Sequence, residues 1–121
     1  MNIIYNILLI WCLSFFTLGK ANLVGKYCGN IFGNEINIST GNNVSNITAN
    51  IFGEKLQCNN EGFIFINNSL IFSKNKSDCL NKNLQQIGGC PCPPNVKYND
   101  KNNFLDIIGT PIGYIKLEHC Y

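Results

Sequence analysis

The apolar pattern is most distinctive in residues 62–73, where two short runs rich in Ile and Phe flank the pair Asn67-Asn68. After Gly, Asn is the residue that best tolerates a positive φ, so this stretch predicts a β-hairpin with a two-residue turn. Both arms are apolar on both faces. We therefore expect the hairpin to lie inside the fold rather than at a solvated edge.

Turn signals recur along the residues that precede this hairpin. In residues 44–52, Ile47, Ala49 and Ile51 alternate with polar residues, which is typical of a half-buried strand. The tetrapeptide Asn-Ile-Phe-Gly occurs at 30–33 and again at 50–53, which indicates one hairpin geometry used twice. We expect strands at 26–32, 35–40, 44–52 and 55–58, separated by turns at Gly33-Asn34, Gly41-Asn42-Asn43 and Gly53-Glu54.

One helix and three more strands follow the hairpin. Ser77 is a good N-cap residue, Asp78 suits the first turn, apolar residues recur at helical spacing, and Gly88-Gly89 ends the helix. Further strands are expected at 96–98, 104–108 and 114–120. The predicted fold is all-β and mainly antiparallel: a small meander barrel or tight sandwich of about eight short strands, with one short helix near 78–87. Phe and Ile should fill most of a barrel this small, so any cavity should be small.

The first 21 residues predict a signal peptide. An apolar run at 3–16 is followed by small residues at the spacing that a signal peptidase reads. A retained membrane anchor is the alternative, but the run is shorter than the ~18 to 20 residues that usually span a bilayer. We expect cleavage, which leaves a single disulfide-rich β domain at 22–121 that is secreted, with no membrane span after cleavage.

The expected mature domain is nearly neutral. Removing Lys20 leaves eight lysines against seven acidic residues, a net charge of 8 − 7 = +1. The chain contains no Arg. It therefore lacks the usual means of recognising phosphate groups, and we expect no nucleic-acid partner.

Six cysteines remain after Cys12 leaves with the signal peptide, and an even number in an exported chain predicts three disulfides. Zinc is the alternative, but Cys90-Pro91-Cys92 does not have the usual spacing and His119 is the one His. We therefore expect neither a metal nor a cofactor. The predicted disulfide residues are Cys28, Cys58, Cys79, Cys90, Cys92 and Cys120.

The expected strand order restricts how these cysteines pair. Cys90 and Cys92 should not pair with each other, because one rigid Pro between them would strain the bond. The central hairpin returns the chain to Cys58, which should therefore pair with Cys79 at the start of the helix. Cys28 and Cys120 are then left to pair with Cys90 and Cys92, in an order that this reasoning leaves open.

Five Asn-x-Ser/Thr sequons are candidates for N-glycosylation if the host glycosylates exported chains. Their acceptor residues are Asn37, Asn43, Asn46, Asn67 and Asn75. The polar faces of the strands at 35–40 and 44–52 could themselves bind carbohydrate, although a solvated sheet face is polar by default.

Gly25-Lys26-Tyr27 resembles the Gly-x-Trp motif that opens the lipocalins, with Tyr in place of Trp. The resemblance implies a barrel that carries a small apolar ligand, which requires an internal cavity. The chain is much shorter than a typical lipocalin and has no Arg to close the barrel end. We therefore assign no lipocalin ligand site to residues of this chain.

Catalytic groups are sparse. A Ser or Cys triad would need His119, but the sequence has no Gly-x-Ser-x-Gly motif, and the acidic residues are scattered. Cys90-Pro91-Cys92 follows a helix C-terminus, where the helix dipole does not stabilise a thiolate. We therefore expect no enzyme and no catalytic residue.

The hypothesis that the sequence favours is a secreted, non-enzymatic binding or surface-display module, with an extracellular protein or glycan as its partner. The alternatives are a small lipocalin-like carrier of an apolar ligand and a secreted effector or inhibitor. The last of these would act through the loop Cys90-Pro91-Cys92-Pro93-Pro94.

Overall fold

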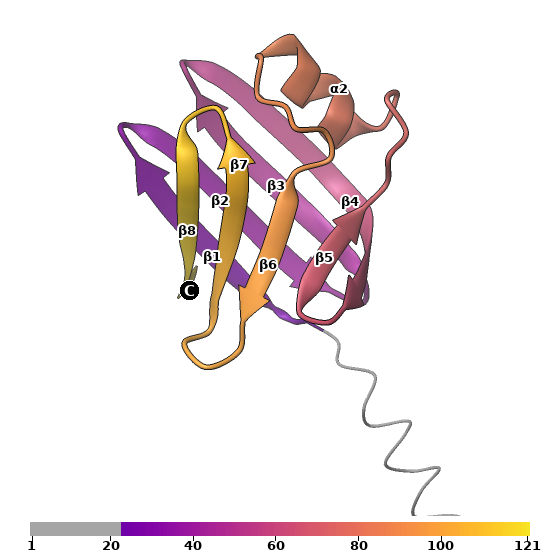
Figure 1. The fold of residues 1–121 in the computed structure, drawn as a ribbon, viewed down its shortest axis with the longest axis vertical. Coiled ribbons are helices and arrows are strands. Elements are labelled where there is room, and N and C mark those ends of the chain that lie inside the picture. The colour runs from indigo at the N-terminus through magenta and orange to yellow at the C-terminus, as the bar shows by residue number, and fades with distance from the viewer. Residues whose placement is uncertain (1–22) are drawn as a thin grey trace, which may run out of the picture.

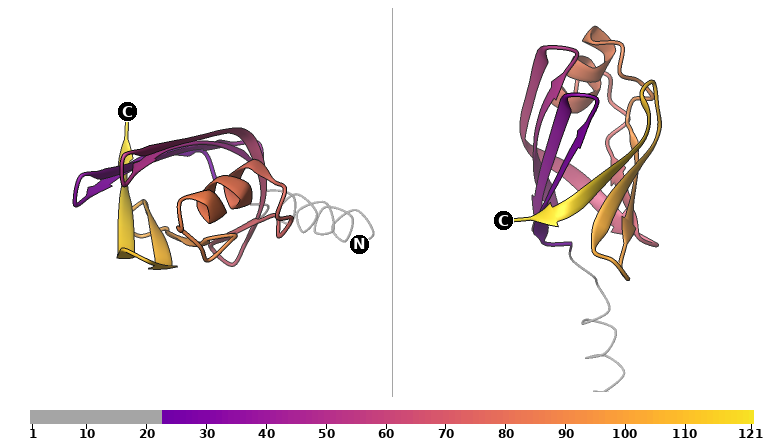
Figure 2. Two further views of the ribbon diagram at one scale, coloured as in Figure 1. Left: turned by 90° about the horizontal axis from the view of Figure 1, so that it is seen from above. Right: turned by 90° about the vertical axis from the view of Figure 1, so that its left-hand side faces the viewer.

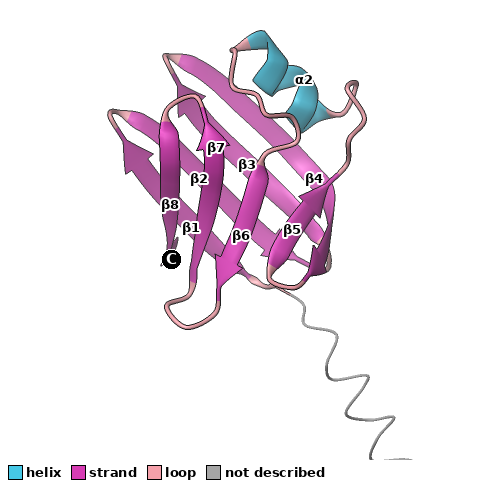
Figure 3. Ribbon diagram, in the orientation of Figure 1, coloured by secondary structure: helices cyan, strands magenta, loops and turns pink. Residues whose placement is uncertain are grey.

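The computed structural model describes residues 23–121, so the expected signal peptide at 1–21 lies outside the described residues. The described chain forms a closed antiparallel barrel in which each strand pairs with the next and β1 pairs with β8 (Figure 1). This arrangement confirms the predicted small meander barrel. It has one short helix, α2, between β5 and β6, as Figure 3 shows.

The elements alternate in direction around the barrel. Their bounds are β1 Gly25–Ile31, β2 Asn34–Gly41, β3 Val44–Ile51, β4 Glu54–Ile66, β5 Ser69–Phe72, α2 Cys79–Gln86, β6 Asn95–Asn99, β7 Phe104–Thr110 and β8 Gly113–Cys120. Within residues 23–121, no helix has the length and apolar character needed to cross a bilayer.

The barrel has two different ends. At the first, which we call the helix end, lie α2 and the β1–β2, β3–β4 and β7–β8 turns, with the β1–β2 turn on the far side from α2 (Figures 1 and 2). At the second, which we call the aromatic end, lie the β2–β3, β4–β5 and β6–β7 turns. β4 is long enough to run from one end to the other.

Four of the two-residue turns follow the rule that a hairpin turn of type I′ requires a positive φ at both central residues. The predicted turn at Asn67-Asn68 is confirmed, with φ of 50° and 60°. The repeated Asn-Ile-Phe-Gly segments also form one geometry twice, but the turns are Phe32-Gly33 and Phe52-Gly53. The predictions of Gly33-Asn34 and Gly53-Glu54 were wrong by one residue, because Phe takes the first positive φ and Gly the second.

Two boundary predictions were also wrong. β4 continues through the expected break after Cys58, and the extra residue is absorbed as a bulge opposite β3, where Asn60 has φ 57°. The N-cap of α2 is Asp78 rather than Ser77, and its carboxylate accepts a hydrogen bond from the Cys79 N–H at 2.9 Å.

The central hairpin has only one face in the core, contrary to the expectation that it lies inside the fold. Phe63 and Phe72 are buried, but Ile64, Ile66 and Ile71 are 61%, 51% and 45% exposed. Successive side chains of a barrel strand alternate between the interior and the solvent, and within residues 23–121 no second layer covers this hairpin.

Three disulfides join the six cysteines. Cys58 and Cys79 pair as predicted, with Cα atoms 5.8 Å apart, and this bond ties α2 to β4. All six cysteines are oxidised, which fits a compartment outside the reducing cytosol.

The predicted pairing of Cys28 and Cys120 with Cys90 and Cys92 was wrong. Closure of the barrel places β1 beside β8, so Cys28 pairs with Cys120 at a Cα separation of 5.9 Å. Cys90 pairs with Cys92 across Pro91. Their Cα atoms are 4.7 Å apart, which lies inside the range of about 4.4 to 6.8 Å that a disulfide spans.

Candidate functional site

The candidate site is an apolar cavity of about 70 Å³ inside the helix end of the barrel. Its walls are the inward-facing aliphatic residues of six strands together with α2, and its mouth lies beside the turns of that end. The lining residues that face the interior from the strands are Ile36, Ile38, Ile47, Ala49, Ile51, Leu56, Val96, Ile107 and Ile115. A cavity lined in this way excludes charged ligands, because burying an unpaired charge is costly.

α2 covers the cavity with the apolar face of a short amphipathic helix. Leu80 and Leu84 are buried and line the cavity, whereas Lys82, Gln85 and Gln86 are exposed. The Nδ2 of Asn81 donates to the backbone oxygens of Ser73 and Asn75 at 2.7 and 2.9 Å. These bonds and the Cys58–Cys79 disulfide fix the start of α2 against the sheet.

The C-terminal side of α2 completes the wall. Ile87 is the C-cap residue, and the N–H of Gly89 donates to the oxygen of Leu84 at 2.7 Å. Gly89 and Pro94, which flank the Cys90–Cys92 disulfide, both line the cavity. The Cys-Pro-Cys segment therefore borders the cavity.

Phe52 forms part of the rim of the cavity and is 62% exposed. Its φ of 53° is unusual for an aromatic residue. The buried side chain of Asn34 holds it there, since the Asn34 Oδ1 accepts a hydrogen bond from the Phe52 N–H at 2.8 Å. This bond also links the β1–β2 and β3–β4 turns.

The aromatic end of the barrel is filled instead. Tyr27, which is 1% exposed, packs edge to face on Tyr98, and Phe63 packs against Phe72. The hydroxyls of Tyr27 and Tyr98 both donate to the Oδ1 of Asn103, at 2.7 and 3.0 Å. Burial, with smaller contributions from Tyr98, raises the pKa of Tyr27 to about 12.

Two glycines of β1 lie where neighbouring atoms leave little room for a side chain. A Cβ on Gly25 would come within 3.2 Å of the Tyr27 ring, so the Gly-x-Tyr pattern reflects the space that this ring takes. A Cβ on Gly29 would lie 2.7 Å from the backbone oxygen of Lys116, where β1 meets β8.

One buried carboxyl group lies beside the start of α2. Glu61 is 4% exposed, and its Oε1 accepts a hydrogen bond from the Leu80 N–H at 3.2 Å. Burial and the neighbouring Asp78 carboxyl raise the pKa of Glu61. Glu61, Cys58 and Cys79 bring potential metal-ligating atoms within 4.8 Å of one another, but the disulfide engages both sulfurs and leaves one carboxylate.

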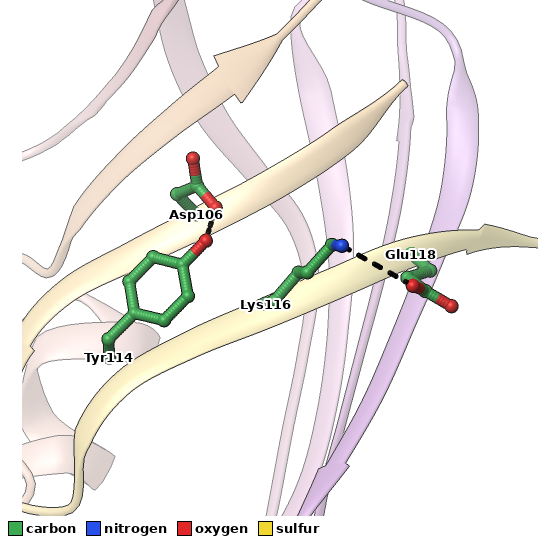
Figure 4. Close-up of polar contacts among 4 residues, drawn as sticks. All are labelled: Asp106, Tyr114, Lys116 and Glu118. Atoms are coloured by element: carbon green, nitrogen blue, oxygen red, sulfur yellow. Dashed lines mark hydrogen bonds and ion pairs between the residues drawn. The ribbon is translucent and has the colours of Figure 1, made fainter. Parts of the chain in front are cut away.

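A polar cluster covers the outer face of β7 and β8 (Figure 4). The Tyr114 hydroxyl donates a hydrogen bond to the Asp106 Oδ1, and this bond raises the pKa of Tyr114. The Lys116 Nζ lies 3.5 Å from the Glu118 Oε1. The Lys116 ammonium also lies over the Phe104 ring, 4.4 Å from its centroid. Exposed pairs of this kind contribute about 0 to 1 kcal/mol to stability.

His119 lies on the last strand, as expected. Its ring contacts Tyr27 and Tyr121 edge to face, with centroid distances of 5.7 and 5.1 Å. It is exposed, and it lies at the aromatic end, away from the cavity.

The sequon asparagines do not gather at one place. Asn43 and Asn67 are exposed turn residues at the aromatic end, and Asn46 is exposed on β3. Asn75 lies between β5 and α2, and Asn37 is half-buried in a shallow polar groove on the outside of β2, β3 and β4. That groove also contains Glu35 and Lys55 but no aromatic ring on which a sugar could stack.

Sequence reasoning did not identify the residues of the cavity. The signal in retrospect is the distribution of side chains: the buried strand residues that line the cavity are aliphatic, whereas the buried aromatic residues Tyr27, Phe63 and Phe72 do not line it. Comparisons with models of protein families, with curated proteins and with solved structures found no match for this chain.

Proposed function

We propose that this protein is an exported, non-enzymatic binding module that takes a small apolar group into the helix end of its barrel. The observation that carries the proposal is the aliphatic cavity beneath α2, with Phe52 at its mouth. Burial of apolar surface would drive binding, since a CH₂ group contributes about 0.8 kcal/mol when it leaves water.

The size of the cavity restricts the ligand. At about 70 Å³, the space is roughly half of the ~150 Å³ cavity that holds benzene in an engineered protein. A whole lipid or retinoid would not fit. The ligand is therefore a short hydrocarbon, or the apolar end of a larger molecule whose remainder extends past Phe52.

The packing of the interior favours a carrier of an apolar group over a binding module that has no site inside its barrel. Phe63, Phe65 and Phe72 fill the aromatic end, and none of them lines the cavity. The effector hypothesis based on the Cys-Pro-Cys loop has less support, because Gly89 and Pro94 on either side of the disulfide help to enclose the cavity.

A titration with linear alcohols tests the proposal. Methyl NMR signals of Ile36, Ala49 and Ile107 should shift on addition of butanol and longer homologues. Affinity should rise about fourfold per CH₂ and then level off once the cavity is full. Absence of any shift in these methyl groups at saturating alcohol would disprove the proposal.

A matched pair of variants separates the cavity from general apolar binding. Ala49→Val adds two methyl groups to the cavity wall and should weaken alcohol binding at least tenfold. Val44→Ile adds one methyl group on the outer face of β3, where Val44 is 39% exposed, and should leave binding unchanged. Equal binding by both variants would place the alcohols elsewhere.

A further inference from the structure

A second feature of the molecule lies outside the barrel, at the end opposite the cavity. Four exposed aliphatic residues, which we call the aliphatic patch, lie on the outer face of β3, β4 and β5. They are Val44, Ile64, Ile66 and Ile71, with exposed fractions of 39%, 61%, 51% and 45%.

These residues form one surface. Ile64 and Ile71 are directly paired across β4 and β5, and Ile66 is the next outward residue of β4. Val44 pairs with Gly62, diagonal to Ile64, and a Cβ on Gly62 would meet no atom within 4 Å. A contiguous apolar surface on a sheet promotes self-association unless something covers it.

Two sequons border the patch. Asn43 directly precedes Val44, and Asn67 directly follows Ile66. The backbone oxygen of Asn43 accepts a hydrogen bond from the Phe63 N–H at 3.0 Å, which holds the β2–β3 turn against β4 next to Ile64. At ~3.3 Å per strand residue, Ile64 lies within ~10 Å of Asn67.

Asn43 and Asn67 are also suitable acceptors. Both are exposed turn residues, with φ of 62° and 50°, so a bulky substituent meets solvent and not the core. The other sequon side chains are more constrained. Asn37 is half-buried, the Oδ1 of Asn46 accepts from the Asn60 N–H, and the Oδ1 of Asn75 accepts from the N–H and hydroxyl of Ser77.

We propose that Asn43 and Asn67 are N-glycosylation sites and that their glycans cover the aliphatic patch. The N-acetyl methyl groups and the C–H faces of the first sugars supply apolar contacts to Val44 and the three isoleucines. Glycans at two sides of the patch would also occupy the space that a second copy of the chain needs. The patch lies at the aromatic end, so this inference does not depend on ligand binding in the cavity.

The test uses the full chain secreted from a eukaryotic cell line that N-glycosylates. Asn43→Gly and Asn67→Gly remove the acceptor amide but preserve the turns, because Gly adopts a positive φ without strain. Peptide N-glycosidase converts each glycosylated Asn to Asp, so mass spectrometry of the treated protein should find one converted site fewer in each variant. Asn42→Gly and Asn68→Gly change the neighbouring turn residue, leave both sequons intact and should lose none.

The covering role has its own readout. Sedimentation should show a monomer for the glycosylated protein and self-association for the Asn43→Gly/Asn67→Gly protein. Adding Ile64→Thr and Ile71→Thr to that protein should restore the monomer. Absence of glycan at both positions overturns the proposal. A glycan-free protein that stays monomeric also overturns it. A glycosylated dimer that the threonine substitutions dissociate overturns it too, since a second copy would then occupy the patch.

Discussion

The two ends of the barrel are built from the same eight strands but are packed in opposite ways. At the aromatic end, Tyr27 packs on Tyr98 and Phe63 packs on Phe72, and none of these four residues lines the cavity. At the helix end, Ile and Ala side chains project inward from the strands and stop short of one another. The difference shows that side-chain reach determines where a small barrel is hollow.

The turns differ in the same sense. The two-residue turns of the aromatic end are Asn42-Asn43 and Asn67-Asn68, in which Asn takes a positive φ at little cost. Two of those at the helix end are Phe32-Gly33 and Phe52-Gly53, in which Phe32 is 89% exposed and Phe52 is 62% exposed. Phe52 lies at the rim of the cavity, whereas Phe32 does not line it.

The largest expected effect concerns the bond that closes the barrel. Cys28–Cys120 joins residues 92 apart, whereas Cys90–Cys92 joins residues 2 apart. Loop entropy in the unfolded chain predicts that Cys28→Ser/Cys120→Ser lowers the free energy of unfolding by about 4.5 kcal/mol. Cys90→Ser/Cys92→Ser should lower it far less. Urea denaturation of both double variants measures the difference, and equal losses would contradict the expectation.

Features that depend on neighbouring residues in the chain were predictable. The strand positions, the Asn67-Asn68 turn and the short helix follow from local alternation, turn residues and capping. The sequence left a barrel and a tight sandwich both open, because the pairing of β1 with β8 joins segments that share no local signal. The Cys28–Cys120 bond depends on that closure, which is why the pairing with Cys90 and Cys92 was wrong.

The cavity was beyond sequence reasoning for a related reason. Ile36, Ile107 and other lining residues were identifiable as interior positions from their alternation. Whether these side chains fill the interior depends on which residues of the other strands face them, and the pattern within one strand does not contain this information. Likewise, Ile64 and Ile71 are exposed because no other element of the described part of the chain covers the outer face of β4 and β5, and an apolar run alone does not contain this information.

A matched pair of leucines tests the packing difference directly. Leu105 is fully buried at the aromatic end and does not line the cavity, whereas Leu56, 3% exposed, does. Leu105→Ala should destabilise by about 4 kcal/mol and Leu56→Ala by about 2 to 3 kcal/mol, because Leu56 already lacks packing partners on its cavity side. Urea denaturation gives both values. A larger loss at Leu56 would mean that the helix end is the better packed one.

The smallest expected change in stability comes from Glu61, which lies beside the first turn of α2, the helix that covers the helix end. The pKa of Glu61 is raised in the folded protein, so the folded state binds its proton more tightly than the unfolded state does. Its contribution to stability is therefore complete below the ordinary Glu pKa, near 4.5, and is lost as the pH rises through the raised value.

Glu61→Gln removes this titration while keeping an acceptor for the Leu80 N–H. The stability of the variant relative to the wild type should therefore increase as the pH rises from 4 through that window and then become constant. Asp78→Asn preserves an N-cap residue but removes the neighbouring carboxyl. In Asp78→Asn the pKa of Glu61 should be raised by less but should still be raised, since burial is the larger cause of the raised pKa. The pH range over which Glu61 changes the stability should therefore become narrower. Urea denaturation between pH 4 and pH 8 provides the measurement, and a difference between wild type and Glu61→Gln that does not vary with pH would show that Glu61 titrates normally.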